Sequence, residues 1–282
     1  MTEVNYLESL NPLQYESVCS TEGPNLIIAG AGTGKTKVLT TRVAHIIDNN
    51  LAFPSQILCV TFTNKAAREM SERVQKLVSQ NMEKMPWMGT FHSIGAKIIR
   101  NHAEVIGLKQ SFTILDKDDQ LSLIKQIIKA ENLDQSQFSP KLIQSKIDHW
   151  KNKALNPNDI KSESLDNLVD EKSLSIYKIY QARLFEINCL DFGDLLLQCI
   201  NLFKVPDIHK RYSNNFKYIH VDEYQDTNAA QYKWLKLLGS HHQNVCCVGD
   251  DDQSIYSWRG AEVDNMLRFE KEFKNAKVIR LK

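Results

Sequence analysis

The stretch Ala29-Gly30-Ala31-Gly32-Thr33-Gly34-Lys35-Thr36 decides how this sequence folds. An apolar run over 25–30 precedes it and predicts a buried strand, and residues 37–49 follow with apolar side chains at helical spacing. A strand, a glycine-rich turn ending in Gly-Lys-Thr and a helix together indicate a phosphate-binding loop. Backbone N–H groups and the positive end of the helix dipole would hold phosphate there. The expected ligand is therefore a nucleoside triphosphate.

Two side chains of this loop have predicted roles in phosphate chemistry. The Lys35 ammonium would reach the outer phosphates, and the Thr36 hydroxyl would ligate magnesium. The general pattern has a glycine five positions before Gly34, where this chain has Ala29. Alanine fits at that position if its φ is negative. A chance glycine-rich turn between a strand and a helix is the alternative that the loop alone leaves open.

The composition is that of an ordinary globular protein. The 282 residues suggest about two domains, and 42% of them are hydrophobic and 24% charged. With a net charge of +1, nucleic-acid binding would need a local basic patch. The cysteines form no C-x-x-C pair, so buried thiols are expected rather than metal or disulfide sites. No signal peptide or membrane-spanning run is visible, which predicts a cytoplasmic protein without membrane contact.

Strands and helices alternate at both ends of the chain but not in its middle. Buried strands are expected at 57–62, 87–90, 216–221 and 244–249. Between about residues 116 and 202 the pattern is helical and polar. The alternation predicts an α/β fold, a parallel sheet with helices on both faces. The middle is predicted to be an all-α insertion into that domain.

A second segment with predicted chemistry is Val221-Asp222-Glu223-Tyr224-Gln225-Asp226-Thr227. It follows an expected strand, at the sheet edge where ligands bind in open parallel sheets. Asp222 would hold magnesium, usually through water, because Mg²⁺ keeps part of its hydration shell. Glu223 would accept a proton from the water that attacks the γ-phosphate. A solvated acidic turn is the alternative for such a pair taken alone.

A third segment, residues 248–261, also follows an expected strand. Gln253 can donate to a phosphate oxygen through its amide. Tyr256 and Trp258 precede Arg259, and exposed aromatic rings beside a cation can stack on unpaired bases. Burial of both rings in the core is the alternative, although the surrounding Gly, Ser, Asp and Arg residues seldom line a dry core.

In this order, the three segments resemble those of superfamily 1 helicases of the UvrD/Rep group. The resemblance runs from about residue 10 to residue 279, and Ala29 is normal in that family's phosphate loop. It implies a RecA-like P-loop NTPase domain interrupted by an all-α subdomain. The implied boundaries place the RecA-like domain at 1–108 and 208–282 and the helical insertion at 109–207.

The resemblance also implies a set of ATP and magnesium residues. Residues 10–14 are similar to the family's glutamine motif, in which Gln14 would read adenine. Lys37 lies where many relatives have an arginine that stacks on adenine, and lysine cannot reproduce that planar stack. The implied catalytic residues are Lys35, Glu223 and Gln253. The implied nucleotide-binding residues are Gln14, Ala29, Gly30, Ala31, Gly32, Thr33, Gly34, Lys35, Thr36 and Lys37, and the magnesium ligands are Thr36 and Asp222.

Residues 61–70 and 90–93 resemble two DNA-contacting motifs of the family, and 191–196 resembles the segment that returns the chain from the insertion. The implied DNA-binding residues are Phe62, Thr63, Asn64, His92, Tyr256, Trp258 and Arg259. For His92, a helix-capping role stays open. Four lysines within 141–153 would suit DNA phosphates, but a solvated helix face is the expected interpretation.

The resemblance implies an ATP-driven 3′-to-5′ DNA helicase or translocase. Its substrates would be single-stranded DNA and junctions of single strand with duplex, in repair or replication, with repair proteins as candidate partners. The family needs a second RecA-like domain, in cis or in trans, and its first motif would begin after Lys282. An arginine finger can contribute ~10³–10⁵ in rate, so these residues alone are expected to hydrolyse ATP poorly. Two alternatives stay open: a non-hydrolysing module that binds single strands or nucleotide and needs a partner chain, and part of a helicase–nuclease.

Overall fold

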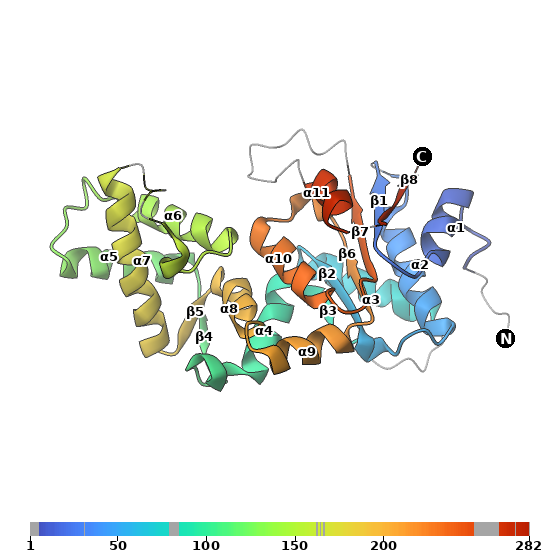
Figure 1. Cartoon of the computed structure of the whole chain (residues 1–282), viewed down its shortest axis with the longest axis horizontal. Helices are drawn as coiled ribbons and strands as arrows, with labels where there is room; N and C mark the ends of the chain where they lie inside the picture. Colours follow the sequence, from blue (N-terminus) through green and yellow to red (C-terminus); the bar gives the residue numbers. More distant parts are fainter. Residues whose placement is uncertain are drawn as a thin grey trace. The chain divides into compact units, whose positions relative to one another are not determined.

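The structure is a computed structural model of the chain. It describes residues 6–30, 32–78, 85–161, 163, 165, 167–250, 265–273 and 275–281. The chain divides into two compact units, whose elements are labelled in Figure 1. The first unit comprises Met1–Ile94, Pro206–Asn228 and Leu235–Lys282, and the second comprises Gly95–Val205 and Ala229–Trp234.

The first unit contains a parallel sheet. Its described residues form six strands in the order β3-β2-β6-β7-β1-β8, and each strand pairing is parallel. Every residue of β1, β2 and β7 is buried, so both faces of the sheet are covered. The predicted α/β fold is confirmed. The strands are β1 (Asn25–Ala29), β2 (Ile57–Thr61), β3 (Met88–Thr90), β6 (Tyr218–Val221), β7 (Val245–Gly249) and β8 (Lys277–Leu281).

Helices follow the strands of this unit, as alternation predicts. Ile27 of β1 and Cys59 of β2 belong to one buried cluster that also contains Val38 and Met70 from the two following helices. The helices that lie in this unit wholly or in part are α1 (Pro12–Cys19), α2 (Lys35–Asp48), α3 (Asn64–Leu77), α4 (Phe91–Asn101), α9 (Pro206–Asn215), α10 (Ala229–Leu238) and α11 (Asn265–Glu272).

The second unit is mostly helical, but the prediction of an all-α insertion is wrong in one respect. Two three-residue strands, β4 (Thr113–Leu115) and β5 (Cys189–Asp191), pair in parallel. Strands of that length are too short to show alternation in the sequence. The helices that lie wholly in this unit are α5 (Lys117–Ala130), α6 (Pro140–Asn152), α7 (Leu168–Glu186) and α8 (Asp194–Leu202).

A buried ionic cluster holds α6 to the β5–α8 turn. The Lys151 ammonium lies 2.7 Å from Asp191 Oδ2 and 2.9 Å from Asp194 Oδ1. The Tyr180 hydroxyl also donates to Asp191 Oδ2, at 2.8 Å. Burial alone would lower the pKa of Lys151, but the two carboxylates raise it above its usual value, so the lysine stays charged. The expected solvated face of 141–153 is therefore wrong at Lys151.

The unit boundaries differ from the expected domain boundaries of 108/109 and 207/208. The chain passes from the first unit to the second between Ile94 and Gly95, within α4, and returns between Val205 and Pro206. A Cβ at Gly95 would lie 2.4 Å from the Leu195 carbonyl oxygen, so the later part of α4 packs closely on α8. The domain boundaries in the sequence stay a prediction.

Two further sequence predictions concern cysteines and membranes. All six cysteines are free thiols, and Cys59, Cys246 and Cys247 are buried in strands, as expected. Within the part of the chain that the structure describes, no helix is both long and apolar enough to cross a membrane.

Candidate nucleotide and DNA site

The phosphate loop joins β1 to α2 and uses glycine where its backbone needs it. Gly32 and Gly34 have φ angles of +79° and +91°, in the left-handed region that glycine adopts without steric cost. Ala29 ends β1 and is absent from the residues with positive φ. The position that lacks the expected glycine therefore does not require one. Ala31 lies outside the described residues.

Gln14 lies directly against this loop. Its Nε2 donates to the Thr33 carbonyl oxygen at 2.9 Å, and its Oε1 accepts from the Asn11 N–H at 3.1 Å as part of the α1 capping box. The Lys37 ammonium donates to the Ser9 carbonyl oxygen at 2.6 Å. The structure thus brings both candidate adenine residues to the loop. An adenine that binds to the Gln14 amide must therefore compete with the bonds that Gln14 makes to Thr33 and Asn11.

The sheet order brings the phosphate loop, the acidic turn and a further carboxylate, Asp250, to one edge. Strands β6, β7 and β1 are neighbours, and their carboxyl ends lead to Asp222, Asp250 and the phosphate loop respectively. The Lys35 ammonium forms an ion pair with Asp250 Oδ2 at 2.7 Å. The Asp250 side chain is 1% exposed and that of Lys35 is 13% exposed. The lysine predicted to bind phosphate is thus held by a buried carboxylate.

The acidic pair after β6 is partly shielded from solvent, because its second member, Glu223, is half-buried. Asp222 is buried, and its Oδ1 accepts from the Glu223 N–H at 3.1 Å. Burial and then the charge of Glu223 raise the pKa of Asp222 to about 6, against the opposing effects of that N–H bond and of Lys35. Glu223 has φ +50°, a left-handed conformation that costs a non-glycine residue about 1–3 kcal/mol. Such strain is typical of functional sites.

Gln225 links the acidic turn to the end of β7. Its Nε2 donates to Glu223 Oε2 at 2.6 Å, and its Oε1 accepts from the Asp250 N–H at 3.1 Å. Sequence reasoning gave neither Gln225 nor Asp250 a role. The available signal was weak: Asp250 directly follows an expected strand, and Gln225 lies two residues after the candidate base.

The DNA candidates near β2 and β3 lie where those strands end. Thr63 and Asn64 are exposed, and the half-buried Phe62 ring lies 5.4 Å from the Phe91 ring, centroid to centroid. Thr63 Oγ1 accepts from the Ala66 N–H at 3.1 Å and so caps α3. The Asn64 side chain, at the start of α3, thus lies on the surface, while the Phe62 ring packs against Phe91.

His92 lies in the first turn of α4. Burial lowers its pKa to about 4, so the imidazole is neutral at pH 7. At the start of this helix, the Ser93 N–H donates to Thr90 Oγ1 at 3.1 Å, and the Thr90 N–H donates to Ser93 Oγ at 2.9 Å. A reciprocal Thr–Ser pair thus supplies the cap that was left open for His92.

The remaining site predictions lie outside the described residues. They concern Gln253 as a catalytic residue and Tyr256, Trp258 and Arg259 as DNA-binding residues. Their roles stay predictions from the sequence.

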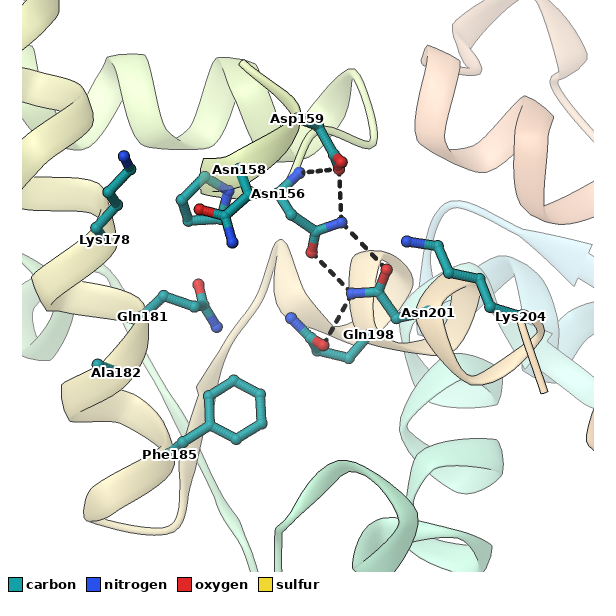
Figure 2. A pocket seen from close by; sticks show the side chains of 11 residues that line it. Asn156, Asn158, Asp159, Lys178, Gln181, Ala182, Phe185, Gln198, Asn201 and Lys204 are labelled. Atoms are coloured by element: carbon teal, nitrogen blue, oxygen red, sulfur yellow. Dashed lines mark hydrogen bonds between the residues drawn. The ribbon is translucent and has the colours of Figure 1, made fainter. Parts of the chain in front are cut away.

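A cavity of about 680 Å³ lies in the second unit, and none of the predicted site residues lines it. Figure 2 shows that its wall carries a hydrogen-bonded series of side chains. Asn156 Nδ2 donates to Asp159 Oδ2 at 2.7 Å, and Asn201 Nδ2 donates to Asn156 Oδ1 at 2.7 Å and to Gln198 Oε1 at 3.1 Å. The amides of this wall bind one another and join the start of the 157–159 turn to α8.

The parallel sheet, with a Gly-Lys-Thr loop at its carboxyl edge, defines a P-loop α/β protein with a RecA-like domain. Residues 10–274 match the family described as the UvrD/REP helicase N-terminal domain, and the chain belongs to that family.

Two relatives show how much of a longer protein these residues represent. The chain is 50% identical over 285 residues to DNA helicase II of Rickettsia typhi, and the match covers 100% of this chain and 43% of the relative. It is 49% identical over 276 residues to the ATP-dependent DNA helicase PcrA of Staphylococcus aureus, with 98% and 38% covered. The chain therefore spans about two fifths of the length of these relatives.

Proposed function

We propose that this chain is the ATP-binding and single-strand-binding part of an ATP-dependent 3′-to-5′ DNA helicase or translocase. The observation that carries the proposal is the convergence of Lys35, the Asp222–Glu223 turn and Asp250 at the carboxyl edge of one parallel sheet. The names of the two relatives, a DNA helicase and an ATP-dependent DNA helicase, support the same activity. Junctions of single strand with duplex, met in repair or replication, would be its substrates.

In this proposal, ATP lies against the phosphate loop. Lys35 binds an outer phosphate, Gln14 and Lys37 lie on the adenine side, and Glu223 takes a proton from the attacking water. The Asp222–Glu223 pair suits this chemistry, because a preformed acidic turn can hold a water and its proton acceptor close to the γ-phosphate. Gln253 would complete the phosphate contacts.

Magnesium fits the donors that the chain supplies. Thr36 and Asp222 offer a hydroxyl and a carboxylate, the hard oxygen ligands that Mg²⁺ prefers. No group of three or more acidic, histidine or cysteine side chains that could hold a metal occurs among the described residues. Mg²⁺ usually takes only one or two protein carboxylates, with water and substrate phosphates as its other ligands. When bound, it would neutralise charge on the phosphates.

The DNA strand would run across the ends of β2 and β3 and onto the third segment. Phe62, Asn64 and His92 supply a ring, an amide and a neutral imidazole for that path. Base stacking and hydrogen bonding of this kind tolerate any sequence, which suits a translocase. The second RecA-like domain that the proposal requires, in cis or in trans, would supply the opposite wall of the ATP site.

Steady-state ATPase of the full-length gene product, with and without oligo-dT, tests this proposal. Single strands should stimulate hydrolysis, and Glu223→Gln should abolish it while fluorescent ATP still binds. The matched control is Asp226→Asn, which neutralises an exposed acid of the same segment. ATP binding without any turnover would instead support the non-hydrolysing module. A full-length protein that binds neither ATP nor single-stranded DNA would refute the proposal.

A further inference from the structure

The Lys35 ammonium already forms an ion pair with Asp250, so phosphate binding to Lys35 also affects Asp250. Asp250 holds it at 2.7 Å from a nearly buried position. A phosphate that binds Lys35 must share the ammonium with Asp250 or replace it. Because like charges repel, a phosphate close to the Asp250 carboxylate favours replacement. The end of β7 is therefore the part of the sheet edge that responds directly to an anion at the loop.

A single side chain connects that strand end to the candidate base. Gln225 accepts from the Asp250 backbone N–H through Oε1 and donates to Glu223 Oε2 through Nε2. The oxygen and nitrogen belong to one planar amide, so a displacement of either end turns both. Gln225 is 6% exposed, so packing leaves its amide few alternative positions. A shift of Asp250 thus has a direct mechanical path to the Glu223 carboxylate.

The backbone of the turn gives independent support. Glu223 is held in the left-handed region, and its carbonyl oxygen accepts from the Asp226 N–H at 3.0 Å. A strained residue keeps its conformation only where several surrounding contacts impose it. The backbone bond fixes the main chain of Glu223, and the bond from Gln225 fixes its carboxylate. The base is therefore oriented from two sides.

We propose that Gln225 is a positioning residue, which sets the orientation of the Glu223 carboxylate according to whether Asp250 is paired with Lys35. This inference rests on the proposed ATP hydrolysis. When phosphate replaces Asp250 at Lys35, the Asp250 N–H shifts, and the Gln225 amide turns with it and, still bonded to Glu223, carries the Glu223 carboxylate towards the attacking water. Glu223 thus becomes available as a base only when phosphate occupies the loop.

The test compares Gln225→Met with Gln198→Met in the full-length gene product. Both substitutions remove one donated and one accepted hydrogen bond from glutamines that are 6% and 5% exposed, and Gln198 lies in the second unit. Misplacing a catalytic group by about 1 Å can cost ~10²-fold in rate. We expect Gln225→Met to lower kcat about 10- to 100-fold with KM and the affinity for fluorescent ATP unchanged. Gln198→Met should leave kcat within about twofold, whatever it does to the melting temperature.

A second variant keeps the test decisive if Gln225→Met folds poorly. Gln225→Glu preserves length and an acceptor for the Asp250 N–H but loses the donor to Glu223, so kcat should again fall without a change in KM. The inference is overturned if both Gln225 variants retain kcat, or if kcat falls only in proportion to the folded fraction. An unaltered protein that binds ATP but never hydrolyses it would refute the proposed function, and this inference with it.

Discussion

The two units each hold a lysine against aspartate, with different consequences. In the first unit, Lys35 pairs with one carboxylate at a sheet edge and keeps some solvent exposure. In the second unit, Lys151 pairs with Asp191 and Asp194, and its side chain is completely buried. In the proposed function a phosphate replaces the partner of Lys35, whereas the complete burial of Lys151 keeps anions in solution away from it.

The difference shows that the surroundings of an ion pair, more than its distance, decide its use. Both shortest N–O separations are 2.7 Å. Breaking the Lys151 pair leaves uncompensated buried charge and is strongly destabilising, whereas at Lys35 the ammonium keeps some exposure to solvent, so an incoming anion could supply the replacement charge. The second unit therefore uses its lysine to fix a fold. The first unit has a lysine that suits reversible binding.

The largest expected effect comes from a substitution that breaks the buried ion pairs of Lys151 with Asp191 and Asp194. Lys151→Met leaves Asp191 and Asp194 buried without a cation, so we expect the free energy of unfolding to fall by about 3–5 kcal/mol. Native-state hydrogen exchange should locate the loss in α6 to α8. Lys153→Met, at an exposed position just after the same helix, is the control and should change stability by no more than about 0.5 kcal/mol. A loss below about 1 kcal/mol for Lys151→Met would remove the distinction between the two lysines.

A buried group without a partner extends the comparison. His220 lies in β6 between Cys59 of β2 and Cys246 of β7, and neither ring nitrogen has a hydrogen-bond partner. Burial, with a smaller contribution from Arg42, holds the pKa of His220 well below its usual value, so the ring stays neutral where Lys151 stays charged.

The lowered pKa of His220 predicts a loss of stability in acid. Below about pH 6.5 the unfolded chain binds a proton that the folded one does not, so the stability present above that pH is lost as the pH falls, by up to about 1.4 kcal/mol per pH unit. His220→Leu should remove this share of the slope between pH 7.5 and 5.5 in urea unfolding. His241→Gln, at an exposed position, should preserve the slope. Equal slopes in all three proteins would show that His220 does not contribute.

A substitution of Asp250 tests whether phosphate competes with this carboxylate for Lys35. Asp250→Asn removes the competing charge but leaves the backbone N–H that donates to Gln225. Because the ammonium no longer has to exchange one anionic partner for another, ATP should bind more tightly, by about fivefold or roughly 1 kcal/mol. Titration with fluorescent ATP and magnesium at fixed ionic strength measures this, with Asp226→Asn as the charge-matched control. Weaker ATP binding after Asp250→Asn would mean that Asp250 helps to hold the ligand.

The smallest expected effect probes how rigidly Lys151 is held. A Cβ at Gly193 would lie 3.0 Å from Cβ and Cδ of Lys151, and Gly193 has a φ of −65° that alanine accepts. Only crowding therefore opposes Gly193→Ala, and a lysine stem fixed at both ends cannot move aside. We expect a loss of about 1 kcal/mol in thermal unfolding. In the Lys151→Ala background, Gly193→Ala should lower the stability by less than it does in the unaltered protein. An equal loss of stability in both backgrounds would show that the crowding does not come from the Lys151 side chain.

The sequence predicted the sheet well because its strands are short buried runs followed by local signals. Positions 25–30, 57–62, 216–221 and 244–249 each contain an observed strand. The short β4–β5 pair was missed because three-residue strands carry no measurable alternation. The burial of Lys151 was missed because its two partners lie 40 and 43 positions away, where helical spacing gives no information.

The candidate site was predictable where one segment supplies the chemistry. The phosphate loop and the acidic turn are contiguous stretches, so their residue types could be interpreted directly. Gln225 and Asp250 could not be assigned in this way. Each acts through a hydrogen bond or ion pair to a residue on a different strand connection, and sequence spacing does not reveal which partner it meets.

The sequence by itself determined that a strand, a glycine-rich turn and a helix occur around Lys35. Those features depend on local spacing and on glycine's freedom to adopt the φ angles seen at Gly32 and Gly34. Only the tertiary structure decided that Lys35 meets Asp250, 215 residues later, and that Gln225 connects this pair to Glu223. The physical reason is the order of strands: packing of the whole sheet sets β1, β7 and β6 side by side, and no local interaction encodes which strands become neighbours.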